Sequence, residues 1–242
     1  MSAAPCLVAL AALSFAASAA SAQIIFSDDF ESGTDAKWTR FDLIGGTSYS
    51  AAGGRYQFES VPLPALPFTV ATGSGISDSV TSPSLFAHGR FRASFRMDNA
   101  ETSVTFAIRT DAAGSIGYAL SMNNIENGIG ISILPSTTNT VWAPFTVEEG
   151  VEYIMEASFF GTSLGLKAWA AGDPEPLLPQ LTLSDSTWLD GGIAALAMYN
   201  NGPLEGTVLS ASFDDVTFAV PAPGPAALAA AGLLALTIRR RR

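Results

Sequence analysis

The chain has 242 residues, 48% of them hydrophobic, and its 22 acidic and 12 basic residues give a net charge of −10. Such an acidic chain is a poor partner for nucleic acid and for anionic membrane surfaces. Its one cysteine, Cys6, excludes a disulfide framework, and its one histidine, His88, argues against a zinc site.

The first 22 residues are typical of a secretory signal peptide. An apolar segment runs from Leu7 to Ala17, and Ala20-Ser-Ala precedes Gln23 as an A-x-A cleavage site, although no Lys or Arg precedes the apolar segment. We therefore expect the protein to be exported and cut after Ala22. Cleavage removes Cys6, so the mature chain would contain no cysteine.

Residues 23–219 predict one all-β domain. Alternating polar and apolar residues recur between Gly, Asn, Asp and Pro turns, and no stretch has a convincing helical period. Short turns such as Asp98-Asn99 favour a meander of neighbouring strands. The clearest strands are Gly89–Met97, Ser103–Thr110, Gly117–Met122, Gly128–Leu134, Val151–Phe160, Leu164–Ala170, Ile193–Tyr199 and Val208–Ala219.

One hairpin, from Val151 to Ala170, can be given a register. The residues expected on its buried face are Met155, Ala157, Phe159, Leu166 and Ala168. Pairing Phe160 with Gly165 achieves this burial, whereas a slip of one residue would bury Lys167. This register places Glu156 opposite Trp169.

Several segments of the body carry a family resemblance. They are Phe26-Ser-Asp-Asp-Phe-Glu-Ser-Gly, Trp38, the strand and loop from Leu166 to Pro176, Asp185-Ser-Thr, Gly191-Gly-Ile-Ala and Ser212-Phe-Asp-Asp-Val-Thr-Phe. Together they resemble the concanavalin A-like lectin/glucanase superfamily over most of the body. The resemblance implies a jelly-roll β-sandwich of two antiparallel sheets with adjacent first and last strands. Galactose-binding-like carbohydrate modules are similar in their opening and final segments and are the alternative fold.

Five acidic residues are candidates for a structural calcium site. One group lies near the first strand and consists of Asp28, Asp29 and Glu31, and the other lies in the last strand and consists of Asp214 and Asp215. Pairing of the two terminal strands would bring these groups together. Calcium takes 6 to 8 oxygen ligands, and related sandwiches often hold a structural calcium near these strands. Strict alternation, however, sends Asp214 and Asp215 to opposite faces. The alternative is that the acids cap solvated strand ends and that no cofactor is required.

Aromatic residues beside polar groups are candidates for polysaccharide binding, because an aromatic ring stacks on the apolar face of a sugar. The outward face of the hairpin would carry Trp169 with Glu156 and Lys167. Trp142, Tyr199 and Asn200 are further candidates, whereas Trp38 and Trp188 are expected to pack in the core or at an edge. If Trp169 is the platform, Trp169→Ala abolishes retention on polysaccharide.

The sequence offers no recognisable catalytic motif. Hydrolytic relatives carry alternating carboxylates of the type Glu-x-Asp-x-x-Glu, and the acidic segment from Glu148 to Glu156 lacks that spacing. No Gly-x-Ser-x-Gly nucleophile motif occurs, and His88 precedes a strand in a turn. We therefore expect a non-catalytic protein with a lectin-like domain; a glycan-active hydrolase or lyase on the same sandwich is the alternative.

The C-terminal 23 residues, from Val220, form a three-part pattern. Pro221 and Pro223 precede an apolar run, Ala226–Ile238, and the chain ends in Arg239, Arg240, Arg241 and Arg242. The run would reach about 20 Å as a helix, short of the ~30 Å membrane core. The layout resembles the PEP-CTERM sorting signal of Gram-negative bacteria, although Ala222 stands where that family usually has Glu.

This second resemblance implies that an exosortase processes the chain near the prolines. A short hydrophobic helix would hold the chain transiently in the inner membrane, with the arginines on the cytoplasmic side. The destination would be the cell surface or the extracellular matrix. An ordinary C-terminal membrane anchor is the alternative. Without both ends, eight basic residues remain against 22 acidic ones, a net charge of about −14 for the mature body.

Overall fold

The computed structural model describes residues 22–43, 45–62, 71–77, 87–99, 101–136, 140–200 and 205–221. All of them except Pro221 belong to one compact body, Ala22–Val220. Residues 1–21 of the predicted signal segment lie outside the described residues, as do Pro223 and Arg239–Arg242 of the sorting pattern. Val220 ends the last strand and Pro221 follows it. Within the described residues, no helix is long and apolar enough to cross a membrane.

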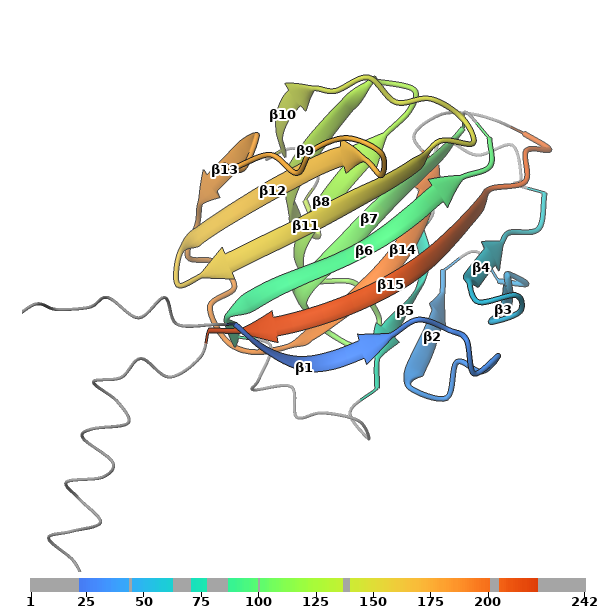
Figure 1. Ribbon diagram of the computed structural model, residues 1–242, viewed down its shortest axis with the longest axis horizontal. Coiled ribbons are helices and arrows are strands. Elements are labelled where there is room, and N and C mark those ends of the chain that lie inside the picture. The colour runs from blue at the N-terminus through green and yellow to red at the C-terminus, as the bar shows by residue number, and fades with distance from the viewer. Residues whose placement is uncertain are drawn as a thin grey trace, which may run out of the picture. The chain divides into compact units, whose positions relative to one another are not determined.

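The body is a sandwich of two antiparallel sheets, which Figure 1 shows one behind the other. The eight-stranded sheet has the order β13 (Leu181–Ser184), β12 (Ser163–Ala170), β11 (Glu152–Phe160), β6 (Gly89–Met97), β15 (Ser210–Val220), β4 (Tyr56–Glu59), β3 (Ser48–Ser50), and β1 (Gln23–Asp28) also pairs with β15. The seven-stranded sheet has the order β10 (Thr140–Pro144), β9 (Gly128–Leu134), β8 (Gly117–Asn123), β7 (Thr102–Thr110), β14 (Ile193–Asn200), β5 (Ala71–Ile76), β2 (Trp38–Asp42).

This architecture confirms the expected all-β jelly-roll sandwich. All eight strands expected from alternation are present, with bounds within two residues of the prediction, and the first and last strands pair as the resemblance implied. The meander is only partly correct. Strands β7 to β10 are neighbours in one sheet and β11 to β13 in the other, but the Asp98-Asn99 turn joins β6 to β7 across the sandwich.

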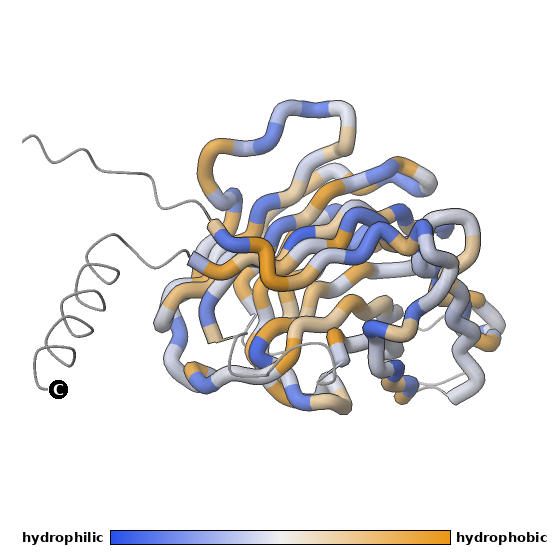
Figure 2. The backbone as a smooth tube through the Cα atoms, turned by 60° about the horizontal axis from the view of Figure 1, so that its bottom comes forward, coloured by the Kyte–Doolittle hydropathy of each residue, from blue (hydrophilic) through white to orange (hydrophobic). Residues whose placement is uncertain are grey.

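Large apolar side chains fill the space between the sheets. Phenylalanines from both sheets are fully buried there, among them Phe91, Phe95 and Phe213 from one sheet and Phe106 from the other. Phe106 contacts both Phe91 and Phe95, with ring centroids 5.1 and 6.1 Å apart. Along the strands in Figure 2, hydrophobic and hydrophilic residues alternate, as expected when one face of each strand enters the core.

The predicted hairpin is correct in its faces and wrong in its register. Residues Met155, Ala157, Phe159, Leu166 and Ala168 are all fully buried, as predicted. However, Phe160 pairs with Ser163 rather than Gly165, so Glu156 faces Lys167 and Ile154 faces Trp169. A shift of two residues keeps every side chain on its face, so burial alone could not choose between the two registers. The turn decides: Gly161 has a φ of 57°, which suits the first position of a two-residue hairpin loop.

A β-bulge corrects the expected placement of Asp214 and Asp215. The pairing of β15 with β6 shifts between Asp214 and Thr217, and Asp215 has a φ of 50°. The extra residue interrupts the alternation, so that Phe213 and Val216 both enter the core and neither Asp214 nor Asp215 does. The prediction that the two acids lie on opposite faces was therefore wrong.

A second bulge turns an arginine into the sandwich. The pairing of β14 with β7 shifts between Ile193 and Ala195, and Arg109, with a φ of 51°, is 3% exposed. Its guanidinium lies over the rings of Tyr118 and Phe159. It donates hydrogen bonds of 2.8–3.0 Å to the carbonyl oxygens of Ala87, Trp188 and Gly161. Burial lowers the pKa of Arg109 from its ordinary value.

Replacement of Arg109 should therefore destabilise the fold strongly. Arg109→Met removes the guanidinium, so the carbonyl oxygens of Ala87, Trp188 and Gly161 lose the hydrogen bonds that it donates. This loss should lower the free energy of unfolding by about 3 kcal/mol. Arg90→Met, at an exposed position of β6, is the matched control and should stay within about 0.5 kcal/mol of the original protein. Urea denaturation measures both values, and equal stability of the two variants would contradict this role of Arg109.

Candidate functional site

The outer face of the seven-stranded sheet carries a row of mostly small residues that crosses every strand. The strand registers align one residue from each strand in this transverse row. In order from β10 to β2, the row is Trp142, Gly130, Ser121, Thr105, Ala197, Gly73 and Phe41. An aromatic residue thus stands at each end of a floor without large side chains.

The neighbouring residues widen this row into an open groove of about 250 Å³. Ala107, Ala119 and Ser132 are each less than 10% exposed although they face away from the core, so they form a deep floor. Phe41 and Ala107 pack with Ala195 and Ala197 in an apolar cluster separate from the main core. The small side chains therefore create the space that the groove occupies.

Trp142 lies flat over a glycine at the edge of the groove. A Cβ atom on Gly130 would fall 2.8 Å from Cε3 of the indole and 2.9 Å from Cζ3, which shows that the ring covers the backbone where a side chain would otherwise stand. Because Trp142 is still 41% exposed, the opposite face of the indole is open to solvent. A flat, exposed ring of this kind suits stacking on a sugar.

Hydroxyl groups and Tyr199 supply polar contacts along the groove. Thr105 Oγ1 and Ser121 Oγ are 2.7 Å apart, and Ser132 Oγ and Thr140 Oγ1 are 2.8 Å apart. One hydrogen bond within the first pair uses a single proton, so a second proton can reach a third group. Burial raises the pKa of Tyr199 and nearby Ser121 moderates the rise, so the phenol stays protonated at neutral pH.

Glu126 contributes a carboxylate at the rim. It lies in the turn between β8 and β9, and its backbone N–H donates a 3.1 Å hydrogen bond to Asn123 Oδ1. The same turn is tied to the end of β10, because the N–H of Phe145 donates to the carbonyl of Asn127 at 3.0 Å. Among the described residues that line the groove, Glu126 is the one with a formal charge.

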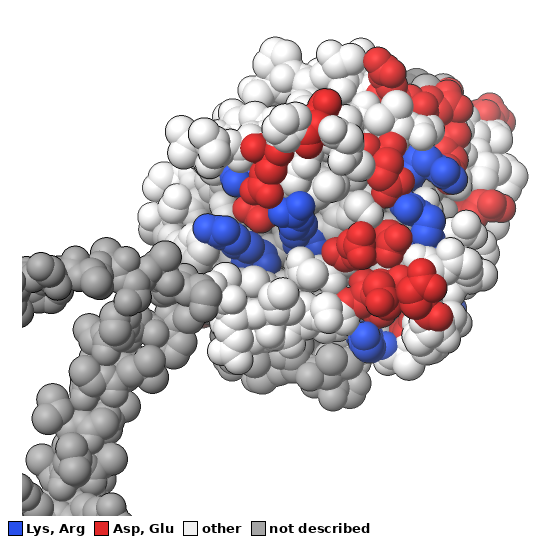
Figure 3. All heavy atoms as spheres, in the orientation of Figure 1, with Lys and Arg blue, Asp and Glu red and all other residues white. Residues whose placement is uncertain are grey.

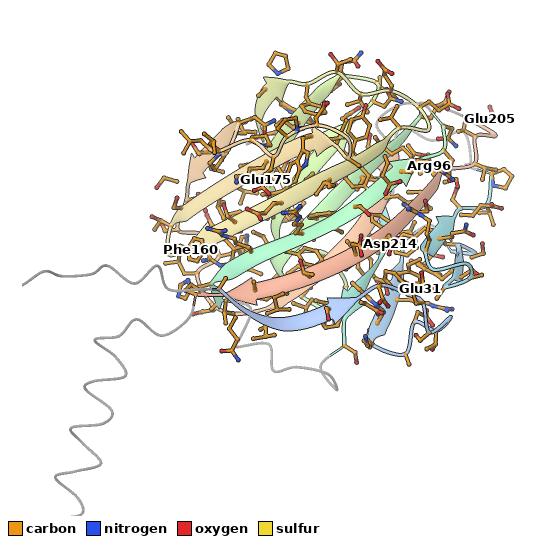
Figure 4. All side chains as sticks on the ribbon, in the orientation of Figure 1. Glu31, Arg96, Phe160, Glu175, Glu205 and Asp214 are labelled. Carbon is orange, nitrogen blue, oxygen red and sulfur yellow. The ribbon has the colours of Figure 1, made fainter. Side chains whose placement is uncertain are left out.

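The predicted hairpin site lies on the other sheet and has a different environment. Trp169 is 5% exposed, and the guanidinium of Arg92 lies 4.8 Å from its ring centre. Glu175 bridges Arg92 and Lys167, at 2.9 and 2.8 Å, over the face that Figures 3 and 4 show. Glu156 is 6% exposed beside them. Trp169 is therefore no open platform, and its role in glycan binding stays a prediction.

The structure instead brings together two of the other predicted residues. Trp142 and Tyr199 line the same groove. Asn200 ends β14 beside Tyr199, but its side chain lies outside the described residues. Trp38 is buried in the core, and Trp188 is packed against it. The sequence reasoning missed Glu126 and Phe41, although a signal for the groove existed: alternate positions of five consecutive strands hold Gly, Ala, Ser or Thr.

Three of the five acidic residues predicted as calcium ligands, Asp28, Asp29 and Asp214, accept hydrogen bonds from N–H groups of the protein. Asp28 is buried and accepts hydrogen bonds from Trp38 Nε1 at 2.8 Å and from the N–H of Phe30 at 3.3 Å, with Lys37 Nζ 3.3 Å away. Asp29 accepts the N–H of Glu31, and Asp214 accepts that of Asp215. Within the described part of the chain, no three His, Cys, Asp or Glu side chains converge.

Comparisons with known proteins support the fold. No family model and no curated protein matches the chain. Among solved structures, the family GH16 endo-β-1,3(4)-glucanase SCLam is 9% identical with a TM-score of 0.57, covering 83% of this chain and 91% of its own. A CBM2 module from the evolved Dit of Lactobacillus casei BL23 phage J-1 is 12% identical with a TM-score of 0.55, covering 84% and 97%.

The carbohydrate-binding module CBM66 from Bacillus subtilis is 13% identical with a TM-score of 0.51, covering 76% of this chain and 95% of its own. At these identities the likeness concerns the fold alone. The chain therefore has the concanavalin A-like sandwich that carbohydrate-binding modules and GH16 glucanases share, as the first resemblance implied.

The acidic residues near the terminal strands generate a prediction about calcium. Because both oxygens of Asp28 are engaged by the protein, we expect the melting temperature to be the same in EDTA and in millimolar calcium. Differential scanning calorimetry measures it. A fall in melting temperature on chelation, reversed by calcium, would instead establish a structural ion.

Proposed function

We propose that this protein binds polysaccharide in the groove on the outer face of its seven-stranded sheet, without cleaving it. The observation that carries the proposal is the indole of Trp142, held flat on Gly130 with its other face exposed at the mouth of the groove. Such a ring stacks on the C–H face of a pyranose, and the hydroxyl pairs and Tyr199 can bond to the sugar hydroxyls.

The structural neighbours support this proposal. Two of them are described as carbohydrate-binding modules and one as a glucanase, and each covers more than three quarters of this chain. Fold alone does not fix function, so the proposal depends on the groove's own chemistry. Apolar stacking surfaces with a few polar groups are what a glycan site needs.

The carboxylates support binding rather than hydrolysis. Glycoside hydrolysis uses two carboxyl groups that flank one bond, about 5 to 10 Å apart. Glu126 is the one carboxylate among the described residues that line the groove. The buried Glu156 of the predicted hairpin site lies on the opposite sheet. The alternative function is a hydrolase or lyase on the same sandwich.

We further propose that the protein works outside the cell. The signal-like first 22 residues and the proline, apolar and arginine pattern at the C-terminus support export followed by exosortase-type processing. The acidic, cysteine-free body suits the cell surface or the extracellular matrix, where it would meet polysaccharide. Its partners would then be the processing enzyme, transiently the inner membrane, and a glycan.

Substitution of two tryptophans distinguishes the two candidate faces. We expect Trp142→Ala to weaken retention on insoluble β-glucan or another bound polysaccharide at least tenfold, because a lost stacking ring costs roughly 2 kcal/mol. Trp169→Ala is the matched control and should keep its retention. Depletion assays over a panel of polysaccharides measure both. Full retention by Trp142→Ala, or release of reducing ends at enzymatic rates, would contradict the proposal.

The processing proposal concerns the two ends of the mature protein. Mass spectrometry of protein from its native cells should find Gln23 as the first residue and an end near Pro221 to Pro223. Loss of the terminal arginines is the expected result, because exosortase-type cleavage would separate them from the body. A mature form that retains Arg239–Arg242 would support an ordinary membrane anchor instead.

A further inference from the structure

Trp142 separates two hollows rather than closing one. On one side lies the groove of about 250 Å³, and on the other lies a hollow of about 230 Å³ lined by the β8–β9 turn and the end of β10. Trp142 and Glu126 are the residues that line both. A ligand that filled both hollows would therefore pass over the indole and beside the carboxylate.

The position of Glu126 is fixed by its turn, while its carboxylate is exposed. The hydrogen bond from its backbone to Asn123 holds the turn over the end of β8. No described residue forms an ion pair with the carboxylate. Its negative charge acts on the hydroxyl of Tyr199, whose pKa is raised mainly by burial and further by this charge. The carboxylate and the phenol of Tyr199 therefore lie near each other, and the exposed carboxylate is available to a ligand as an acceptor.

Neither hollow contains a cation that would balance this charge. Among the described lining residues there is no Lys, Arg or His. Alternation along β7 would point Arg109 outward with Thr105 and Ala107, but the bulge turns it into the sandwich. Arg40, next to Phe41, is paired with Asp35 at 2.7 Å. The surroundings of the ligand are therefore negative, in a body whose net charge is also strongly negative.

From this arrangement we infer that the site binds an internal segment of a neutral polysaccharide, which crosses Trp142 from one hollow to the other, and that Glu126 selects against acidic sugars. The inference rests on the proposed function and defines its substrate class. A carboxylate accepts hydrogen bonds from sugar hydroxyls on either side of the ring, whereas it repels a uronate at the same place. A single terminal sugar would fill one hollow only.

Isothermal titration calorimetry with a soluble neutral glucan of known chain length tests whether the protein binds internal segments of the polysaccharide. If the protein binds internal segments, several protein molecules should bind to each glucan chain. The affinity for neutral gluco-oligosaccharides should also rise with their length until both hollows are filled. A stoichiometry of one protein per chain, with affinity already maximal for a monosaccharide, would overturn this part of the inference. Absence of binding to any glycan would reject the proposed function itself, so the two failures are distinguishable.

Substitution of Glu126 tests the selection. Glu126→Gln keeps an acceptor oxygen but removes the charge, so affinity for neutral oligosaccharides should fall roughly threefold to tenfold. We expect no detectable binding of oligogalacturonate by the original protein and measurable binding by Glu126→Gln. Glu149→Gln is the matched control, because Glu149 is exposed and lines neither hollow. Equal binding of neutral and acidic oligosaccharides by the original protein would overturn the role assigned to Glu126.

Discussion

The candidate site depends on one constraint, the near absence of side-chain volume along a row that crosses the seven-stranded sheet. Trp142 can lie flat only because Gly130 has no Cβ, and Phe41 occupies the space over Gly73 at the other end of the row in the same way. Between these rings, Ser, Thr and Ala keep the floor low. A larger residue at any of these positions would fill the groove or lift a ring from its seat.

Two bulges determine which charges reach which surface. The bulge at Arg109 turns this cation away from the groove and into the sandwich, where its guanidinium donates hydrogen bonds to three carbonyl groups. The bulge at Asp215 keeps both Asp214 and Asp215 out of the core, while Phe213 and Val216 remain buried in it. Each bulge adds one residue to a strand, and each therefore changes the electrostatics of a whole face without a change in the fold.

Much of the fold could be predicted from the alternation of polar and apolar residues. The errors concern one hairpin register and one β-bulge, and each has an identifiable physical cause. Strand faces follow from the period of two, so the buried residues of the β11–β12 hairpin were correct. Register also depends on the turn, and the positive φ of Gly161 is not visible in the alternation. A bulge such as that at Asp214–Asp215 breaks the period itself, which is why strict alternation misplaced these acids.

The site was harder to predict, since its parts come from strands far apart in the sequence. Trp142 was recognised as an aromatic residue, but its seat on Gly130 depends on the pairing of β10 with β9. Trp169 looked equally suitable, and only the pairing of β11 with β6 and the loop that carries Glu175 bring Arg92 over its ring. Exposure of an aromatic face is thus a property of the tertiary structure rather than of the strand pattern.

The most direct test of the proposed site is to locate the bound glycan by NMR. Titration of isotope-labelled protein with a neutral oligosaccharide that it binds should shift the indole N–H of Trp142 and the amides of Gly130, Ser121 and Glu126, all on or beside the groove. Signals from the opposite sheet, around Trp169 and Glu175, should stay in place. Shifts centred on Trp169, with the Trp142 indole unchanged, would contradict the account.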